Sequence, residues 1–157
     1  MSDIDRLQNF FFAAASVSYA GNGLKLTDPE RPGVKIYRFA DDILLYVDEY
    51  YVNGAKSFGS TVIWQDDQPV WYMQYRGFCH DKQASELVKK AMRAAYQEHI
   101  FAGGRGVDLI EGELKYQNVA MHSFGEFHGS DGVATMTKGK DNLLFWHKYS
   151  GGLLVKP

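Results

Sequence analysis

Two segments of the chain repeat apolar residues at intervals of three and four positions, the spacing of one buried face of an α-helix. In the first segment these residues are Ile4, Leu7, Phe11 and Ala14. In the second they are Ala84, Leu87, Val88, Ala91, Met92 and Ala95. Ser2, with Asp5 three residues later, approximates a capping box, and Asp81 suits an N-cap. The pattern predicts one helix over about 3–16 and a second beginning after Asp81.

Elsewhere, apolar and polar residues alternate over short stretches, as in half-buried β-strands. The strands predicted after the first helix are 34–39, 43–52, 57–65 and 70–76. Those predicted after the second are 112–120, 122–128, 132–137 and 142–149, with a short final strand at 153–155. Turn residues occupy 66–69 and 138–141. Strands joined by short turns pair antiparallel, so we predict an α+β fold with one large or two stacked meanders.

The same landmarks occur twice along the chain. Tyr19-Ala20-Gly21 and Phe101-Ala102-Gly103 each follow a predicted helix. Trp71-Tyr72-x-x-Tyr75-x-Gly77 and Phe145-Trp146-x-x-Tyr149-x-Gly151 each close a run of strands. A repeated order of landmarks indicates one supersecondary unit used twice. We therefore predict a single domain over 1–157, built from two α-β4 halves at about 3–77 and 82–151, with both helices packed on the sheet.

Composition narrows the classes of function. The length of 157 residues suits one domain. A net charge of −2 leaves no sequence-wide electrostatic footprint for nucleic acid. The single cysteine, Cys79, excludes an internal disulfide and fits a reducing compartment. The apolar run 10–15 is too short to span a bilayer or serve as a signal segment. We expect a cytoplasmic protein without direct nucleic-acid or membrane partners.

Asp48 is the first candidate site residue, because it lies between Tyr46 and Tyr50 on one face of a predicted strand. A carboxylate on an aromatic and aliphatic face must be hydrogen-bonded or have a raised pKa. Asp48 is therefore a candidate acid–base group or ligand anchor. The alternative is a structural aspartate held by a tyrosine hydroxyl or a backbone amide.

Aromatic residues also gather on another predicted strand, where Trp71, Met73 and Tyr75 share a face. Aromatic content is high at 15%, which is typical of a β-rich core or an aromatic-lined cavity. These three residues are candidates for the wall of a ligand pocket. The alternative is an ordinary core under a helix.

The two glycine-rich loops supply the remaining candidates for binding. If the halves are related by symmetry, the loops flank one site, to which Tyr19 brings a ring, Asn22 an amide and Arg105 a positive charge. Gly103 itself is interpreted as a helix C-cap. Arg105 suits a carboxylate or a phosphorylated ligand through bidentate contacts.

Metal and nucleophile chemistry are weakly supported. On an unbroken strand His122 and His128 would be separated by about 20 Å, so only Glu126 and His128 could share an ion. Cys79-His80-Asp81 has the letters of a catalytic triad, but consecutive residues in a turn do not point at one another. We predict no metal site and no cofactor.

Five stretches together resemble a known family: 18–23, 46–50, 69–77, 105–106 and 149–152. The family comprises bacterial domains of unknown function that occur alone or fused behind helix-turn-helix regulators of the Xre type. Its pattern has an acidic residue after Phe-x-Gly. The stretch 58–64 lacks this acid, whereas Asp131 supplies it in the second half. The fusion implies a domain that senses a small molecule or mediates assembly.

These observations favour a small-molecule-binding or sensor-like module over an enzyme. An interaction or dimerisation module, expected as a homodimer, is the first alternative, because exposed aromatic patches also mark protein interfaces. A hydrolase- or isomerase-like enzyme using Asp48 or Glu126 is the second.

Overall fold

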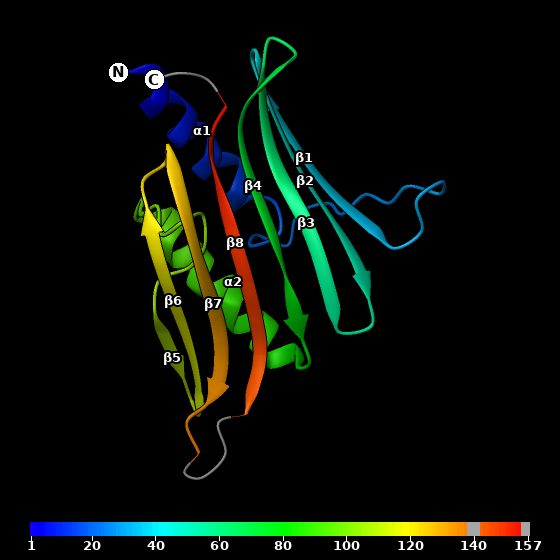
Figure 1. Cartoon of the computed structure of the whole chain (residues 1–157), viewed down its shortest axis with the longest axis vertical. Helices are drawn as coiled ribbons and strands as arrows, with labels where there is room; N and C mark the ends of the chain where they lie inside the picture. Colours follow the sequence, from blue (N-terminus) through cyan, green and yellow to red (C-terminus); the bar gives the residue numbers. More distant parts are fainter. Residues whose placement is uncertain (138–141, 155–157) are drawn as a thin grey trace.

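A computed structural model describes residues 1–137 and 142–154. The described residues form two helices and one eight-stranded antiparallel sheet, with the helices on the same side of the sheet (Figure 1). The elements are α1 (Asp3–Ser16), β1 (Val34–Asp41), β2 (Leu44–Asn53), β3 (Lys56–Gln65), β4 (Gln68–Cys79), α2 (Lys82–Gln97), β5 (Leu109–Glu111), β6 (Leu114–His122), β7 (Glu126–Thr135) and β8 (Leu143–Leu153). The α+β fold class is confirmed.

The strands lie in the order β1-β2-β3-β4-β8-β7-β6-β5. Each group of four is a meander in chain order, and the groups join where β4 pairs antiparallel with β8 (Figure 1). Tyr75 lies opposite Tyr149 at the middle of this seam. The meanders therefore form one large sheet and not two stacked ones. The order of elements is the expected one, while the superposition of 3–77 on 82–151 stays a prediction.

Side-chain caps define where both helices begin. The Ser2 hydroxyl accepts a hydrogen bond from the Asp5 amide at 3.2 Å, and the Asp5 carboxylate accepts one from the Ser2 amide at 3.0 Å. Asp81 Oδ1 accepts from the Ala84 amide at 2.9 Å. Both predicted starts are confirmed, and each cap stabilises its helix by about 1 kcal/mol.

The strands of the second half differ from the predicted ones. The predicted strand 122–128 is wrong, because a turn at 123–125 divides it and the Ser123 hydroxyl accepts from the Glu126 amide at 3.1 Å. The strand predicted to begin at Gly112 begins only at Leu114, because Gly112 takes a φ of +59° in the turn between β5 and β6. No separate strand begins at Leu153, since β8 continues through it. The turn expected at 138–141 and residue 155 lie outside the described residues.

The core fills the space between the helices and the inner face of the sheet. Trp71 is fully buried there and stacks on Phe124 with ring centroids 5.2 Å apart. Its indole nitrogen donates to the Phe124 carbonyl at 3.0 Å. Phe11 of α1 contacts the same indole at 5.2 Å between centroids. Trp71 therefore belongs to the core, whereas Met73 and Tyr75 of the same predicted strand face line the cavity described below.

The length and apolar character of a helix decide whether it can cross a membrane. Within 1–137 and 142–154, neither helix combines the length and the apolar character needed to cross a lipid bilayer.

Candidate functional site

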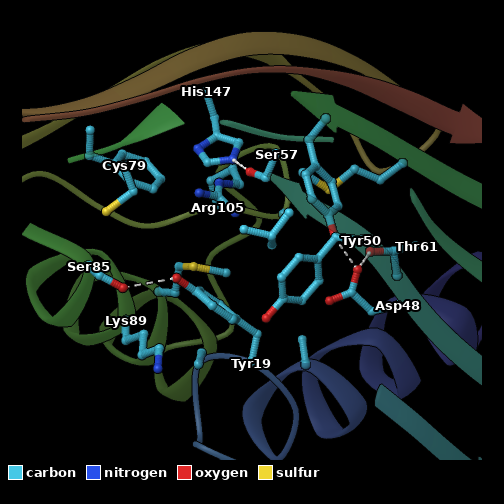
Figure 2. A pocket seen from close by; sticks show the side chains of 18 of the residues that line it. Tyr19, Asp48, Tyr50, Ser57, Thr61, Cys79, Ser85, Lys89, Arg105 and His147 are labelled. Atoms are coloured by element: carbon cyan, nitrogen blue, oxygen red, sulfur yellow. Dashed lines mark hydrogen bonds between the residues drawn. The ribbon is translucent and has the colours of Figure 1, made fainter. Parts of the chain in front are cut away.

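A cavity of about 280 Å³ opens between the two helices and the inner face of β2, β3, β4 and β8 (Figure 2). The alternation of each strand places every second side chain on this face. The loops that follow α1 and α2 also line the cavity and contribute Tyr19 and Arg105. The sequence-predicted Tyr46, Asp48 and Tyr50 all line the cavity.

Asp48 lies buried in the wall, with 5% of its surface exposed. Its Oδ1 accepts hydrogen bonds from the Thr61 hydroxyl at 3.1 Å and from the Tyr75 hydroxyl at 2.5 Å. No described residue donates to Oδ2. Burial raises the pKa of Asp48 to about 6, although the two hydroxyl donors oppose that rise. The carboxyl thus has one satisfied oxygen and one free for a ligand.

Tyrosines surround this carboxyl. Tyr50 stacks on Tyr37 with centroids 6.3 Å apart, and Tyr19 meets the Tyr50 ring edge-on at 6.2 Å. Burial raises the pKa of Tyr46 and of Tyr50 above the ordinary value, so both hydroxyls remain neutral. The walls beside Asp48 are therefore aromatic and uncharged.

The first glycine-rich loop reaches the cavity through Tyr19. The Tyr19 hydroxyl lies 3.3 Å from the Ser85 hydroxyl of α2 (Figure 2), and the Lys89 ammonium lies 4.9 Å from the centre of the Tyr19 ring. Lys89 donates to the Asn22 side chain at 2.8 Å. Asn22 is not part of the cavity wall. Of the two candidate residues in this loop, Tyr19 lines the cavity. Asn22 does not, and it instead accepts a hydrogen bond from the cavity residue Lys89.

Arg105, from the second loop, is buried and paired. Its Nε donates to Asp131 Oδ2 at 2.8 Å, and the Tyr116 hydroxyl donates to the same oxygen at 2.6 Å. Burial alone would lower the pKa of Arg105, but the Asp131 carboxylate outweighs it and raises the pKa. The terminal guanidinium nitrogens make no hydrogen bond to a described residue. Arg105 reaches the cavity, but with its charge already matched.

His147 is a cavity residue that the sequence reasoning missed. Its Nε2 lies 3.4 Å from the Ser57 hydroxyl (Figure 2), and its Nδ1 is buried without a partner among the described residues. Burial first, and then the charge of Arg105, lower the pKa of His147 to about 3. The alternation of Phe145, His147 and Tyr149 along the predicted strand was the signal that could have revealed it.

Three other groups considered in the sequence do not form sites. Cys79 lines the cavity, but its thiol donates to the Asp81 carbonyl at 3.2 Å while the Asp81 carboxylate caps α2, so the triad letters do not converge. Glu126 is exposed and is not part of the cavity wall. The described residues contain no cluster of three or more potential metal ligands. The side chain of His122 lies outside the described part of the chain.

The second half contains a counterpart of the Asp48 arrangement. Asn118 is paired with Asp131 of β7, as Asp48 is paired with Thr61 of β3. The Tyr149 hydroxyl donates to Asn118 Oδ1 at 2.5 Å, matching the bond from Tyr75 to Asp48. Unlike Asp48, Asn118 has hydrogen-bond partners for both of its polar side-chain atoms. Asn118 Nδ2 donates at 2.9 Å to the carbonyls of Ala102 and Gly106 in the second glycine-rich loop.

Comparison with known proteins places the chain in a family. Residues 48–154 match DUF5680, a domain of unknown function, and the chain belongs to this family. No curated protein and no solved structure matches it. The resemblance to a family of unknown function is thereby confirmed at that level.

Proposed function

We propose that this member of the DUF5680 family binds a small organic molecule in the cavity between its helices and its sheet. The observation that carries the proposal is a cavity with aromatic walls toward which an unpaired polar group is directed. Asp48 Oδ2 has no donor among the described residues, although only 5% of the surface of Asp48 is exposed. Apolar pockets with a few convergent polar groups are the usual form of a ligand site.

The volume limits the size of the ligand. About 280 Å³ is near the lower end of the range for small-molecule sites, roughly 300–1,000 Å³. At roughly 30 Å³ per water molecule in the liquid, this space corresponds to about nine waters. The cavity therefore suits a molecule of about ten non-hydrogen atoms, such as one ring with a short side chain.

The arrangement favours binding over catalysis. Nucleophilic catalysis needs a base within hydrogen-bond reach of the nucleophile and a third group that orients the base. Ser57 and His147 are 3.4 Å apart, and the other nitrogen of His147 has no orienting partner among the described residues. Glu126 lies outside the cavity, so an acid–base role would fall to Asp48 alone.

Two finer expectations accompany this proposal. A sensory role agrees with the fusion to Xre-type regulators, and with the bacterial origin, that the sequence resemblance implies. A cytoplasmic location rests on the single cysteine, Cys79, which requires no oxidising compartment.

Filling the mouth of the cavity tests the proposal. Ala55 lies in the hairpin between β2 and β3 and lines the cavity, so an Ala55→Trp side chain would occupy the space. Ligand-observed NMR against a library of compounds of about ten non-hydrogen atoms is expected to yield hits for the natural chain that Ala55→Trp loses. Gln117→Trp is the control, because Gln117 is exposed on β6 and lies away from the cavity. Hits that survive Ala55→Trp would place binding elsewhere, and a library without hits would count against the proposal.

The outer face of the sheet favours self-association as the second candidate. Phe58, Val119 and Met121 are exposed by 59%, 74% and 71%, and they border a shallow hollow on that face. Exposed apolar patches of this kind often mark protein interfaces. We expect light scattering to show a homodimer that Val119→Lys converts to a monomer. A monomeric natural chain at all concentrations would exclude this candidate.

A further inference from the structure

We propose that the cavity selects an organic cation, a protonated amine on a compact aromatic or apolar body, whose N–H groups donate to Asp48 Oδ2. This inference rests on the proposed function and names its ligand class. Three features carry it, namely the contrast between the two halves, the balance of charge in the cavity and the nature of the walls around Asp48.

The contrast between the halves shows what Asp48 lacks. Asn118, the counterpart of Asp48, places Nδ2 against two carbonyl groups of the second glycine-rich loop, at 2.9 Å each. The chain after the first loop instead runs to the sheet edge, where Leu26 bridges to Ile36. Asp48 thus presents an oxygen acceptor to an open space where Asn118 presents a donor to the chain. The missing partner of Asp48 is a hydrogen-bond donor.

A buried carboxylate as the acceptor favours a cation as that donor. Arg105 and Asp131 form a buried pair with 7% and 0% of their side-chain surfaces exposed, so their charges offset each other. His147 is buried and neutral, because its burial and the positive charge of Arg105 both disfavour a proton on the ring. Lys25 and Lys89 also line the cavity, but Lys25 is exposed to solvent and Lys89 donates to the Asn22 side chain. Among the described residues that line the cavity, Asp48 is the one carboxylate, and a buried carboxylate without a cation is costly.

The walls suit a cation as well. Tyr46 and Tyr50 flank Asp48 on β2, and Tyr19 approaches from the loop after α1. Figure 2 shows the ring of Tyr19 and the ring of Tyr50 around the space that Asp48 borders. The face of an aromatic ring attracts a cation, by about 2 kcal/mol when both are removed from water. An ammonium group on Asp48 would thus lie beside the rings of Tyr46 and Tyr50, whereas the Tyr19 ring already has the Lys89 ammonium at 4.9 Å.

Three compounds of similar size but different charge test the ligand class. They are 2-phenylethylamine, 2-phenylethanol and phenylacetate, titrated into the full chain by calorimetry at about pH 8, where Asp48 is ionised. We expect the amine to bind about tenfold more tightly than the alcohol, with phenylacetate weakest. Asp48→Asn is expected to remove the preference, bringing the amine to the affinity of the alcohol.

Asp48→Asn is a well-matched variant because Asn118 already accepts a tyrosine hydroxyl at the corresponding position. Asparagine can keep the bonds from Tyr75 and Thr61 while it replaces Oδ2 with a donor. Should the variant nevertheless unfold, the ratio of the amine affinity to the alcohol affinity in the natural chain still tests the preference for a cation.

The other results are each informative. Equal affinities for amine and alcohol would overturn the cation inference while supporting a binding cavity. Preferred binding of phenylacetate, unaffected by Asp48→Asn, would overturn it and assign the anchor to the terminal nitrogens of Arg105. Binding of none of the three at about 10 mM would overturn the inference, whereas the library screen with Ala55→Trp judges the proposed function separately.

Discussion

Asp131→Asn is expected to lower the free energy of unfolding by about 3–5 kcal/mol, the usual cost of leaving one member of a buried ion pair alone. The Arg105 guanidinium donates to Asp131 at 2.8 Å and is almost fully buried. An arginine cannot shed its proton to escape this situation. The Tyr116 hydroxyl loses a charged acceptor in the same variant. The charge of Arg105 would remain in the core without its partner.

Urea unfolding of four chains measures this effect: the natural one, Asp131→Asn, Arg105→Met and the double variant. We expect the double variant to lose less stability than the sum of the two single variants, because it leaves no buried charge unmatched. Lys90→Met is the control, since Lys90 and Glu111 form an exposed ion pair worth about 0–1 kcal/mol. A loss below about 1 kcal/mol for Asp131→Asn would show that the pair contributes no more than a surface one.

The stability change between pH 7 and pH 4 is expected to differ by about 5 kcal/mol between the variants Asp48→Asn and His147→Gln. The two residues titrate in opposite directions. The folded-state pKa of His147 is about 3, below its unfolded value of 6.5, so its contribution is complete above pH 6.5 and is lost as the pH falls toward 3. At about 1.4 kcal/mol per pH unit, this contribution to the free energy of unfolding falls by roughly 3 kcal/mol between pH 7 and pH 4.

Asp48 has the reverse effect. Its folded-state pKa is about 6, above the unfolded value of 3.8, so the folded protein takes up the proton first. Stability therefore falls as the pH rises from about 4 to about 6, and acidification to pH 4 returns roughly 2 kcal/mol. In the natural chain the two effects nearly cancel.

Unfolding free energies of both variants at pH 7 and pH 4 separate the two contributions. Asp48→Asn keeps only the histidine and should lose about 3 kcal/mol more on acidification than a chain without either group. His147→Gln keeps only the aspartate and should gain about 2 kcal/mol. The other carboxylates titrate in both variants, so the difference removes them. Parallel pH profiles for the two variants would contradict the buried, perturbed state of both groups.

Much of the local structure was predictable from the sequence. The capping residues Ser2 and Asp81 bond to amides three residues away, so a short window of sequence contains the whole interaction. The alternation that places Tyr46, Asp48 and Tyr50 on one face is likewise a property of a single strand. Patterns of this range also identified both helices and the strands of the first half. The C-cap predicted at Gly103 is wrong, because α2 ends at Gln97 with Glu98 as its C-cap.

Errors arose where a local pattern was interrupted by a turn without a strong signal. The stretch 122–128 alternates as a strand should, yet Ser123 and Gly125 form a turn inside it. The Ser123 hydroxyl supplies the bonds to Glu126 that stabilise this turn. Serine is compatible with both structures, so the pattern alone did not distinguish them.

The sequence by itself determined the two helices, the strands of the first half, the antiparallel α+β class and the position of Asp48 on a mostly aromatic face. It did not predict β5, and it misplaced the boundaries of β6 and β7. Only the tertiary structure decided that the meanders join through β4 and β8, that Arg105 is matched by Asp131, and that His147 completes the cavity wall. The physical reason is distance along the chain. Ser57 and His147 are brought together by strands far apart in sequence, and such contacts follow from the packing of the whole sheet, which no local spacing encodes.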